Sequence, residues 1–194
     1  LGSEQLSWIE KSILSTNAVW TIFGQQVLMA KLKFPDISKM LRSEEIPSFL
    51  KPYLKFLGLG IPSNLDAWDG YPAERNRLYQ LMINAKKRFI SLAGDTHNSW
   101  VSELEDQSGS KVGIELGAPS VTSPGITDIL NLDKKKFVNS IVKINKELQW
   151  MDPSNRGYLY LNCAEDKIIA SFNYIKELEE INSDISSSKS FVLN

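Results

Sequence analysis

A short apolar run that ends at a glycine constrains the fold of this 194-residue chain most. Residues 89–93 (FISLA) are predominantly apolar on both faces of an extended chain, which is typical of a strand buried on both sides. Residues 74–87, just before it, are good helix formers with an apolar stripe at helical spacing. A helix that leads into a doubly buried strand predicts helices packed on a sheet, the α/β arrangement.

Two polar side chains with metal-binding chemistry follow this strand. Gly94 lets the backbone leave the strand without strain, and Asp95 and His97, the only histidine of the chain, come next. If the extended geometry persists to His97, both side chains point the same way and begin a site for a hard metal or a phosphate. The alternative is that Asp95 caps the next segment and His97 is an ordinary loop residue. The two readings stay open on these residues alone.

The remaining pattern continues the alternation and then shifts toward strands. The expected fold class is α/β (α+β), with a mixed sheet flanked by helices and an antiparallel later half. Residues 1–181 are expected to form one domain, and residues 182–194, which contain a run of three serines, a flexible tail. The elements expected outside residues 74–93 are helices at 4–15 and 133–146 and strands at 18–23, 100–104, 111–116, 158–163 and 168–174.

Composition excludes several classes of protein. The chain is 42% hydrophobic and 23% charged, so it is long and apolar enough for one substantial core. Its net charge of -1 gives no general attraction for nucleic acid or an anionic membrane. Cys163 is the only cysteine, which rules out an intrachain disulfide. No segment has the length and hydrophobicity of a membrane span, and localisation stays open.

Five blocks in a fixed order identify a family resemblance. In that order the chain resembles the PhoD-like alkaline phosphatases and phosphodiesterases of the binuclear metallophosphatase superfamily, over most of its length as far as about residue 160. The blocks are LGSEQ (1–5), WTIFGQQVLM (20–29), DAWDGYPAER (66–75), LAGDTH (92–97) and VGIELGAPSVTSPG (112–125).

The resemblance implies a four-layered αββα sandwich, of which this chain would supply roughly the second sheet and its helices. The Asp, Gly-Asp and Asn motifs that carry the first metal ligands of the superfamily are not found in these residues. The chain is therefore expected to be the C-terminal half of a catalytic domain. Its expected partners are the missing N-terminal half, a phosphoester substrate, or a second copy bound through an exposed sheet face.

The resemblance also implies a metal centre. Gly94 to His97 stands where the superfamily carries its last Gly-x-x-His ligand motif, so His97 is the first ligand candidate and Asp95 the second. An Asp at this point implies an oxygen-rich site, with calcium alongside a transition metal such as iron. Gln25 lies near the place of another ligand histidine and is a third candidate, or it is an amide that caps a strand end.

An unusual aromatic loop is the candidate for substrate binding. Arg75 has a guanidinium fork that suits a phosphate, and Trp68 and Tyr71 are expected to line a cleft. The alternative for Arg75 is an internal ion pair with Asp69.

Two function classes follow. The first is a phosphoric ester hydrolase, a phosphomonoesterase or phosphodiesterase that works through metal-activated water in the complete protein, with this chain as one part. The second is a non-catalytic fold fragment or binding module that lacks the metal cage.

Overall fold

The computed structural model describes residues 1–41, 52, 59, 62, 64–178 and 184–194. Local sequence accounts for several element ends: Pro72 stands in the first turn of one helix, and the Asp133 carboxylate caps another by accepting the Lys136 backbone N–H. The elements in chain order are α1 (Ser3–Ser15), β1 (Trp20–Gly24), η1 (Ile37–Lys39), η2 (Trp68–Gly70), α3 (Pro72–Asn84), β2 (Arg88–Ala93), β3 (Ser99–Glu105), β4 (Lys111–Gly117), α4 (Ile126–Ile129), α5 (Lys134–Ile144), β5 (Leu148–Asp152), β6 (Gly157–Cys163), β7 (Ile168–Ile175) and β8 (Ile185–Leu193).

The first sheet is mixed and has the strand order β1-β2-β4-β3-β5. Strands β1, β2 and β4 are parallel, whereas β3 is antiparallel to both β4 and β5. Gly24 pairs with Leu92, and Ala93 pairs with Gly117, so the three parallel strands end at the same edge of the sheet. Ligands of open α/β sheets bind outside such carboxyl ends, which makes this edge the first place to look for a site.

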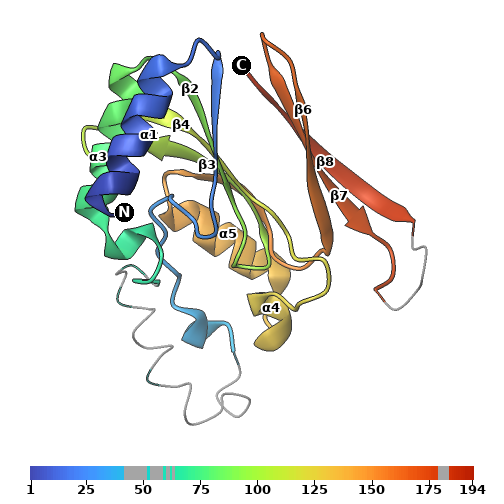
Figure 1. Ribbon diagram of the computed structural model, residues 1–194. Coiled ribbons are helices and arrows are strands. Elements are labelled where there is room, and N and C mark those ends of the chain that lie inside the picture. Colours follow the sequence, from blue (N-terminus) through green and yellow to red (C-terminus); the bar gives the residue numbers. More distant parts are fainter. Residues whose placement is uncertain (42–51, 53–58, 60–61, 63, 179–183) are drawn as a thin grey trace.

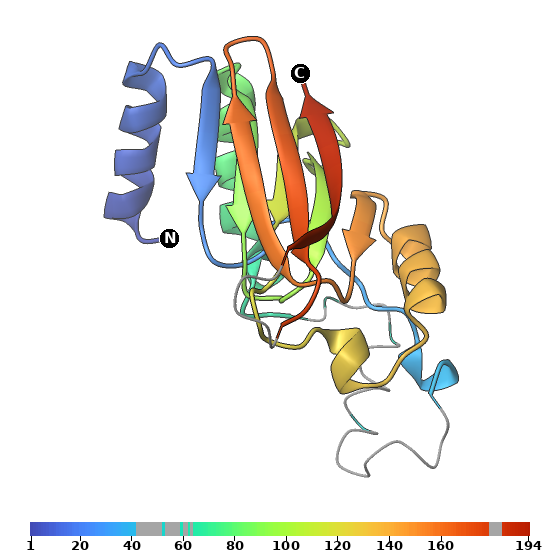
Figure 2. The same cartoon turned by 90° about the vertical axis from the view of Figure 1, so that its right-hand side faces the viewer.

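The second sheet is antiparallel, with the order β6-β7-β8, and it stacks on the first (Figure 1). Helices α1, α3 and α5 cover the opposite face of the first sheet (Figures 1 and 2). One apolar cluster, which includes Leu78, Trp100 and Phe137, fills the space between these helices and the first sheet. A second, which includes Ile90, Leu116 and Phe172, lies between the two sheets. The described residues thus form three layers, helix, sheet and sheet.

The expected α/β fold with a mixed sheet is confirmed, but two expectations about its extent are wrong. The chain contributes strands to both sheets, not only to one. The tail expected at residues 182–194 is not frayed at 185–193, because these residues form β8, which pairs with β7 from Leu193 to Ile185. The expected domain boundary after residue 181 lies outside the described residues.

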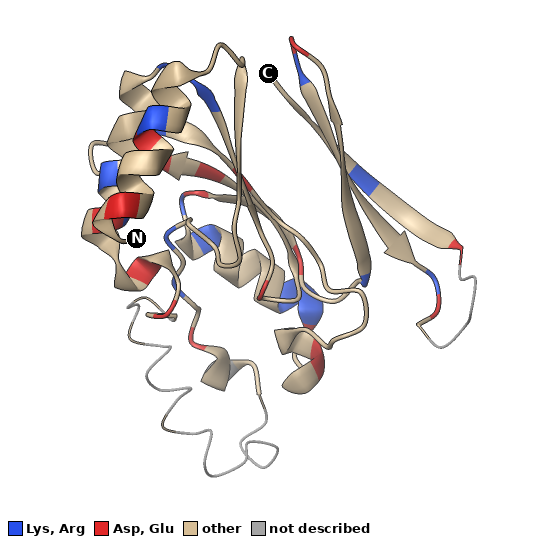
Figure 3. Ribbon diagram, in the orientation of Figure 1, with Lys and Arg blue, Asp and Glu red and all other residues tan. Residues whose placement is uncertain are grey.

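The outer face of the second sheet is exposed and carries little charge. Tyr158, Tyr160 and Val192 are each about half exposed or more on this sheet. Strands β6 and β7 contain no charged residue, and Lys189 is the charged residue of β8 (Figure 3). Among the helices that the structure describes, none has both the length and the hydrophobicity to cross a bilayer.

Candidate metal and substrate site

Three loops meet at the carboxyl edge of the parallel strands. They follow β1, β2 and β4, and backbone hydrogen bonds tie them to one another. The Gln25 N–H donates to Leu92 O at 3.0 Å, the Gly94 N–H donates to Gln26 O at 3.1 Å, and the Ala118 N–H donates to Ala93 O at 2.7 Å. An open depression lies over these loops, and its lining includes Gln25, Gln26 and Gly94.

The loop after β2 does not continue in the extended form expected from the sequence. Asp95 and His97 have φ angles of 62° and 60°, both in the left-handed region. The expected geometry, in which the two side chains alternate along one strand and converge, is therefore wrong. Left-handed residues other than glycine are uncommon and cost about 1–3 kcal/mol each when strained, and they gather at functional sites. Two of them within three residues make this loop a candidate for a functional role.

Its neighbours hold the loop in this shape. The Thr96 N–H donates to Gly94 O, and Asn98 Nδ2 donates to Thr96 O, each at 2.7 Å. Trp100 Nε1 donates to Thr96 Oγ1, also at 2.7 Å. A side chain at Gly125 would overlap the buried Asn98 amide, so only glycine fits where the loop after β4 crosses. Asn98, adjacent to His97 in the sequence, is a supporting residue that the sequence reading missed.

A hydrogen bond to the loop after β4 orients the His97 ring. Its Nδ1 lies 3.1 Å from the carbonyl oxygen of Pro124. Because a carbonyl can only accept, Nδ1 carries the proton, and the lone pair of the neutral ring is on Nε2. Metal-binding histidines are typically fixed by this kind of hydrogen bond from the other ring nitrogen. Asp95 is exposed next to it and lines a neighbouring cavity of about 410 Å³, whose lining residues do not include His97.

Gln25 belongs to a chain of hydrogen bonds that reaches into the core. Its Oε1 accepts from Trp68 Nε1 at 2.7 Å, and its Nε2 donates to Ser91 Oγ at 3.1 Å. Ser91 Oγ in turn donates to Glu115 Oε1 at 3.0 Å. These contacts fix the direction of the amide. The Gln25 carbonyl oxygen keeps a second lone pair, so a metal contact at Gln25 stays a prediction.

A segment without regular structure, residues 29–33, is fixed by side chains at each of its five backbone N–H groups. Glu115 accepts from the N–H of Met29 at 2.7 Å and of Ala30 at 2.9 Å. The three following N–H groups donate to Glu147, Asp69 and Asn145, at 2.9, 3.1 and 2.8 Å. Because the segment continues the loop after β1, these acceptors hold the Gln25 end of the site. No periodicity in the sequence signals this arrangement.

Glu115 is fully buried, and burial raises its pKa to about 7, although its hydrogen bonds from Ala30, Met29 and Ser91 oppose the rise. The folded state therefore holds this proton more tightly than the unfolded state, whose pKa is near 4.5. The contribution to stability is complete below about pH 4.5 and is lost as the pH rises through about 7.

We expect the free energy of unfolding of the native chain, minus that of Glu115→Gln, to be larger at pH 5 than at pH 7.5. The amide has no proton to lose in this range, so the free energy of unfolding of the variant lacks the pH dependence that Glu115 contributes. Urea unfolding of both proteins at the two pH values measures the difference. If the difference between the two free energies of unfolding stays constant or grows with pH, the raised pKa of Glu115 is contradicted.

Arg75 is buried, and the structure gives no support to its expected role in substrate binding. It is 6% exposed, and its Nη1 donates to Asp69 Oδ1 at 2.6 Å and to Met29 O at 3.0 Å. The structure thus favours the ion pair with Asp69. Since Asp69 also accepts the Leu32 N–H, this pair helps to fix residues 29–33.

Arg75→Lys is expected to lower stability and to leave the activity proposed below for the complete protein nearly unchanged. A lysine keeps the charge but loses the planar guanidinium that meets Asp69 and Met29 together, and a charge-assisted hydrogen bond is worth about 1.5–3 kcal/mol. Tm and kcat/KM measured on one preparation of the complete protein separate the two roles. A normal Tm with a kcat/KM lowered more than about 10-fold would instead indicate that Arg75 contacts the substrate.

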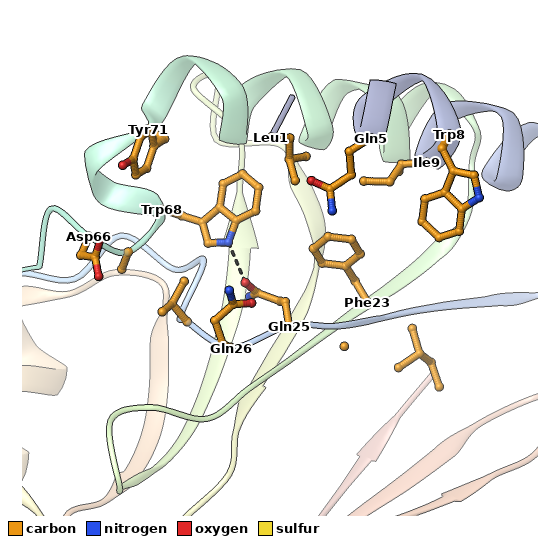
Figure 4. A pocket seen from close by; sticks show the side chains of 14 residues that line it. Leu1, Gln5, Trp8, Ile9, Phe23, Gln25, Gln26, Asp66, Trp68 and Tyr71 are labelled. Carbon is orange, nitrogen blue, oxygen red and sulfur yellow. Dashed lines mark hydrogen bonds between the residues drawn. The ribbon is translucent and has the colours of Figure 1, made fainter. Parts of the chain in front are cut away.

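Trp68 and Tyr71 line a cavity of about 480 Å³ beside the sheet edge (Figure 4). Trp68 is 9% exposed and bonded to Gln25, whereas Tyr71 is 57% exposed. Helix α1 contributes Gln5 and Trp8, which the sequence reading did not assign to the site. The sequence contains a signal for Trp8, because this large apolar residue lies off the apolar stripe of α1; the structure leaves it 66% exposed.

The ligand candidates do not complete a binuclear centre. Such a centre needs about six or more protein ligands. Within the described part of the chain, no group of three or more His, Cys, Asp and Glu side chains is placed to hold a metal ion. His97 and Asp95, two residues apart in the chain, stay ligand candidates, and a full cage would require further residues.

Comparisons with known proteins agree with this architecture. Alkaline phosphatase D of Bacillus subtilis (strain 168) is 28% identical over 197 residues, which cover 99% of this chain and 29% of that protein. The solved structure described as "Structure of PhoD" has a TM-score of 0.73 at 25% identity and covers 99% of this chain and 33% of its own. The chain thus spans about a third of these relatives. The profile of the family described as PhoD-like phosphatase matches residues 1–172, and the chain belongs to that family.

Proposed function

We propose that the complete protein containing this chain hydrolyses phosphoric esters, as a phosphomonoesterase or phosphodiesterase, with water activated by bound metal ions. The observation that carries the proposal is the His97 imidazole, which is fixed through Nδ1 at the carboxyl edge of the parallel strands and keeps Nε2 free to bind. The relation to alkaline phosphatase D supports the reaction class. The strained loop 94–97 agrees with a role in binding.

The proposed metals are calcium and iron. The imidazole nitrogen of His97 suits a transition metal, and the carboxylate of Asp95 and the amide oxygen of Gln25 suit calcium. Bound metal ions of this kind supply a hydroxide at neutral pH and neutralise the charge on the phosphoryl oxygens. The protein residues described here contribute the orientation of these ligands, through Pro124 for His97 and through Trp68 and Ser91 for Gln25.

We further propose that the other ligands come from a polypeptide segment that packs against this chain. The length of the relatives supports this, because the chain spans about a third of them. The weakly charged outer face of β6–β8, with Tyr158, Tyr160 and Val192 exposed, is the surface that a fourth layer of the sandwich would cover. The alternative is that a second copy of this chain covers the same face.

A second candidate function is a non-catalytic fold fragment or binding module. Both polar atoms of the Gln25 amide are already hydrogen-bonded, which favours this second function. Such hydrogen bonds keep the loop after β1 in place without any metal.

An assay of the chain alone tests the proposal. We expect fewer than two metal ions per molecule and no turnover of p-nitrophenyl phosphate or its bis ester above background, with calcium and iron added. The complete protein, under the same conditions, is expected to turn over at least one of the two esters. Turnover by the chain alone that disappears with chelator and with His97→Ala would contradict the requirement for further ligands. No turnover by the complete protein would favour the binding module.

A further inference from the structure

The cavity beside the sheet edge has a composition that suits an organic ring better than a phosphate. Its walls include the aromatic side chains of Trp8, Phe23, Trp68 and Tyr71. None of the described residues that line it is Lys, Arg or His, and Asp66 provides its one charged side chain. A phosphate needs cations or a ring of N–H donors, whereas flat uncharged rings stack on aromatic faces.

Exposure divides the aromatic residues into fixed and available ones. Trp68 is 9% exposed, and its indole N–H is committed to Gln25. Trp8 and Tyr71 are 66% and 57% exposed, and each comes from a different element next to the cavity. Figure 4 shows Trp8 at one end and Tyr71 at the other, with Trp68, Gln5 and Phe23 between them. The exposed amides of Gln5 and Gln26 offer both donors and acceptors to polar groups on a ring.

The cavity and the candidate metal site share a wall. Gly24, Gln25 and Gln26 line both the cavity and the depression over the sheet edge. The Gln26 carbonyl accepts from the Gly94 N–H at 3.1 Å, so this wall is attached to the loop that carries His97. The cavity therefore adjoins the sheet edge where the phosphate of an ester would lie.

We propose that this cavity binds the uncharged ring of the substrate's alcohol group, stacked on Trp8, while the phosphate lies at the sheet edge. This inference rests on the proposed hydrolase function and adds the substrate class, an ester of a cyclic or aromatic alcohol. Pockets of this kind are mostly apolar with a few convergent polar groups, as here.

The first test compares two substrates in the complete protein. With Trp8→Ala, we expect kcat/KM for phenyl phosphate to fall about 3- to 10-fold more than kcat/KM for methyl phosphate, because only the phenyl ester can use the stacking surface. Leu14→Ala is the matched control, since Leu14 is 64% exposed on the same helix and is not among the residues lining the cavity. Equal losses for both esters in Trp8→Ala would overturn the proposal.

The second test does not depend on turnover. Saturation-transfer NMR with benzyl alcohol is expected to detect binding to the complete protein and to Leu14→Ala, and to lose most of the signal in Trp8→Ala. If the native protein gives no signal, the cavity does not bind a ring and the proposal is overturned. This is the result expected if another segment of the complete protein fills the cavity. Binding of benzyl alcohol without hydrolysis of any ester would support the cavity and reject the hydrolase, so the two failures are distinguishable.

Discussion

His97→Ala in the complete protein is expected to lower kcat/KM for p-nitrophenyl phosphate at least about 10- to 100-fold. Changes in residues that only support metal ligands typically cost this much, so loss of a ligand should cost no less. The fold should remain, because the His97 side chain is only half-buried and its hydrogen bond to Pro124 O lies outside the apolar core. Initial rates with a saturating mixture of calcium and iron measure the effect.

Asn131→Ala is the control for this change. Asn131 also has a left-handed φ, of 47°, but it lies after α4 and outside the residues that form the site. We expect it to alter stability slightly and to leave kcat/KM within about two-fold. If His97→Ala were as active as Asn131→Ala, the assignment of His97 as a metal ligand would be contradicted.

Glu115→Ala is expected to destabilise the chain by at least about 3 kcal/mol. The change leaves three buried donors without an acceptor, the N–H groups of Met29 and Ala30 and the hydroxyl of Ser91, and each such loss costs about 1–3 kcal/mol. A cavity at a fully buried position adds to this cost. Urea unfolding at pH 5, where the native Glu115 is protonated, measures the loss.

Glu103→Ala is the matched control, because Glu103 pairs with Lys111 on the surface, where the two side chains are 45% and 59% exposed. Exposed ion pairs contribute about 0–1 kcal/mol, so this variant should unfold close to the native chain. A loss in Glu115→Ala no larger than in Glu103→Ala would mean that residues 29–33 are held by other contacts.

Much of the scaffold could be predicted from the sequence because its signals are local. The doubly buried strand before Gly94 and the helix from Pro72 lie close to where the apolar patterns place them. Strand β8 could not be predicted in this way. Its serine-rich residues have little apolar pattern, and they are ordered by backbone pairing with β7 and by the burial of Leu193.

The candidate site was predicted in its residue types but not in its geometry. The role of the Gly94 to His97 block as a ligand loop stays a prediction, whereas the left-handed conformations of Asp95 and His97 and the contact of His97 with the distant Pro124 are not signalled by any local pattern. For Arg75, the sequence allows both a substrate contact and an internal ion pair, and its burial against Asp69 favours the ion pair. These outcomes depend on tertiary packing, and no local pattern encodes them.

The most direct test of the central claim is the metal content of the complete protein and of its His97→Ala variant, purified and analysed together by mass spectrometry of the elements. If Nε2 of His97 binds a metal, the variant should hold less metal per molecule than the native protein while its circular dichroism spectrum stays the same. Equal metal content in two equally folded proteins would contradict the claim that this chain contributes a metal ligand through His97.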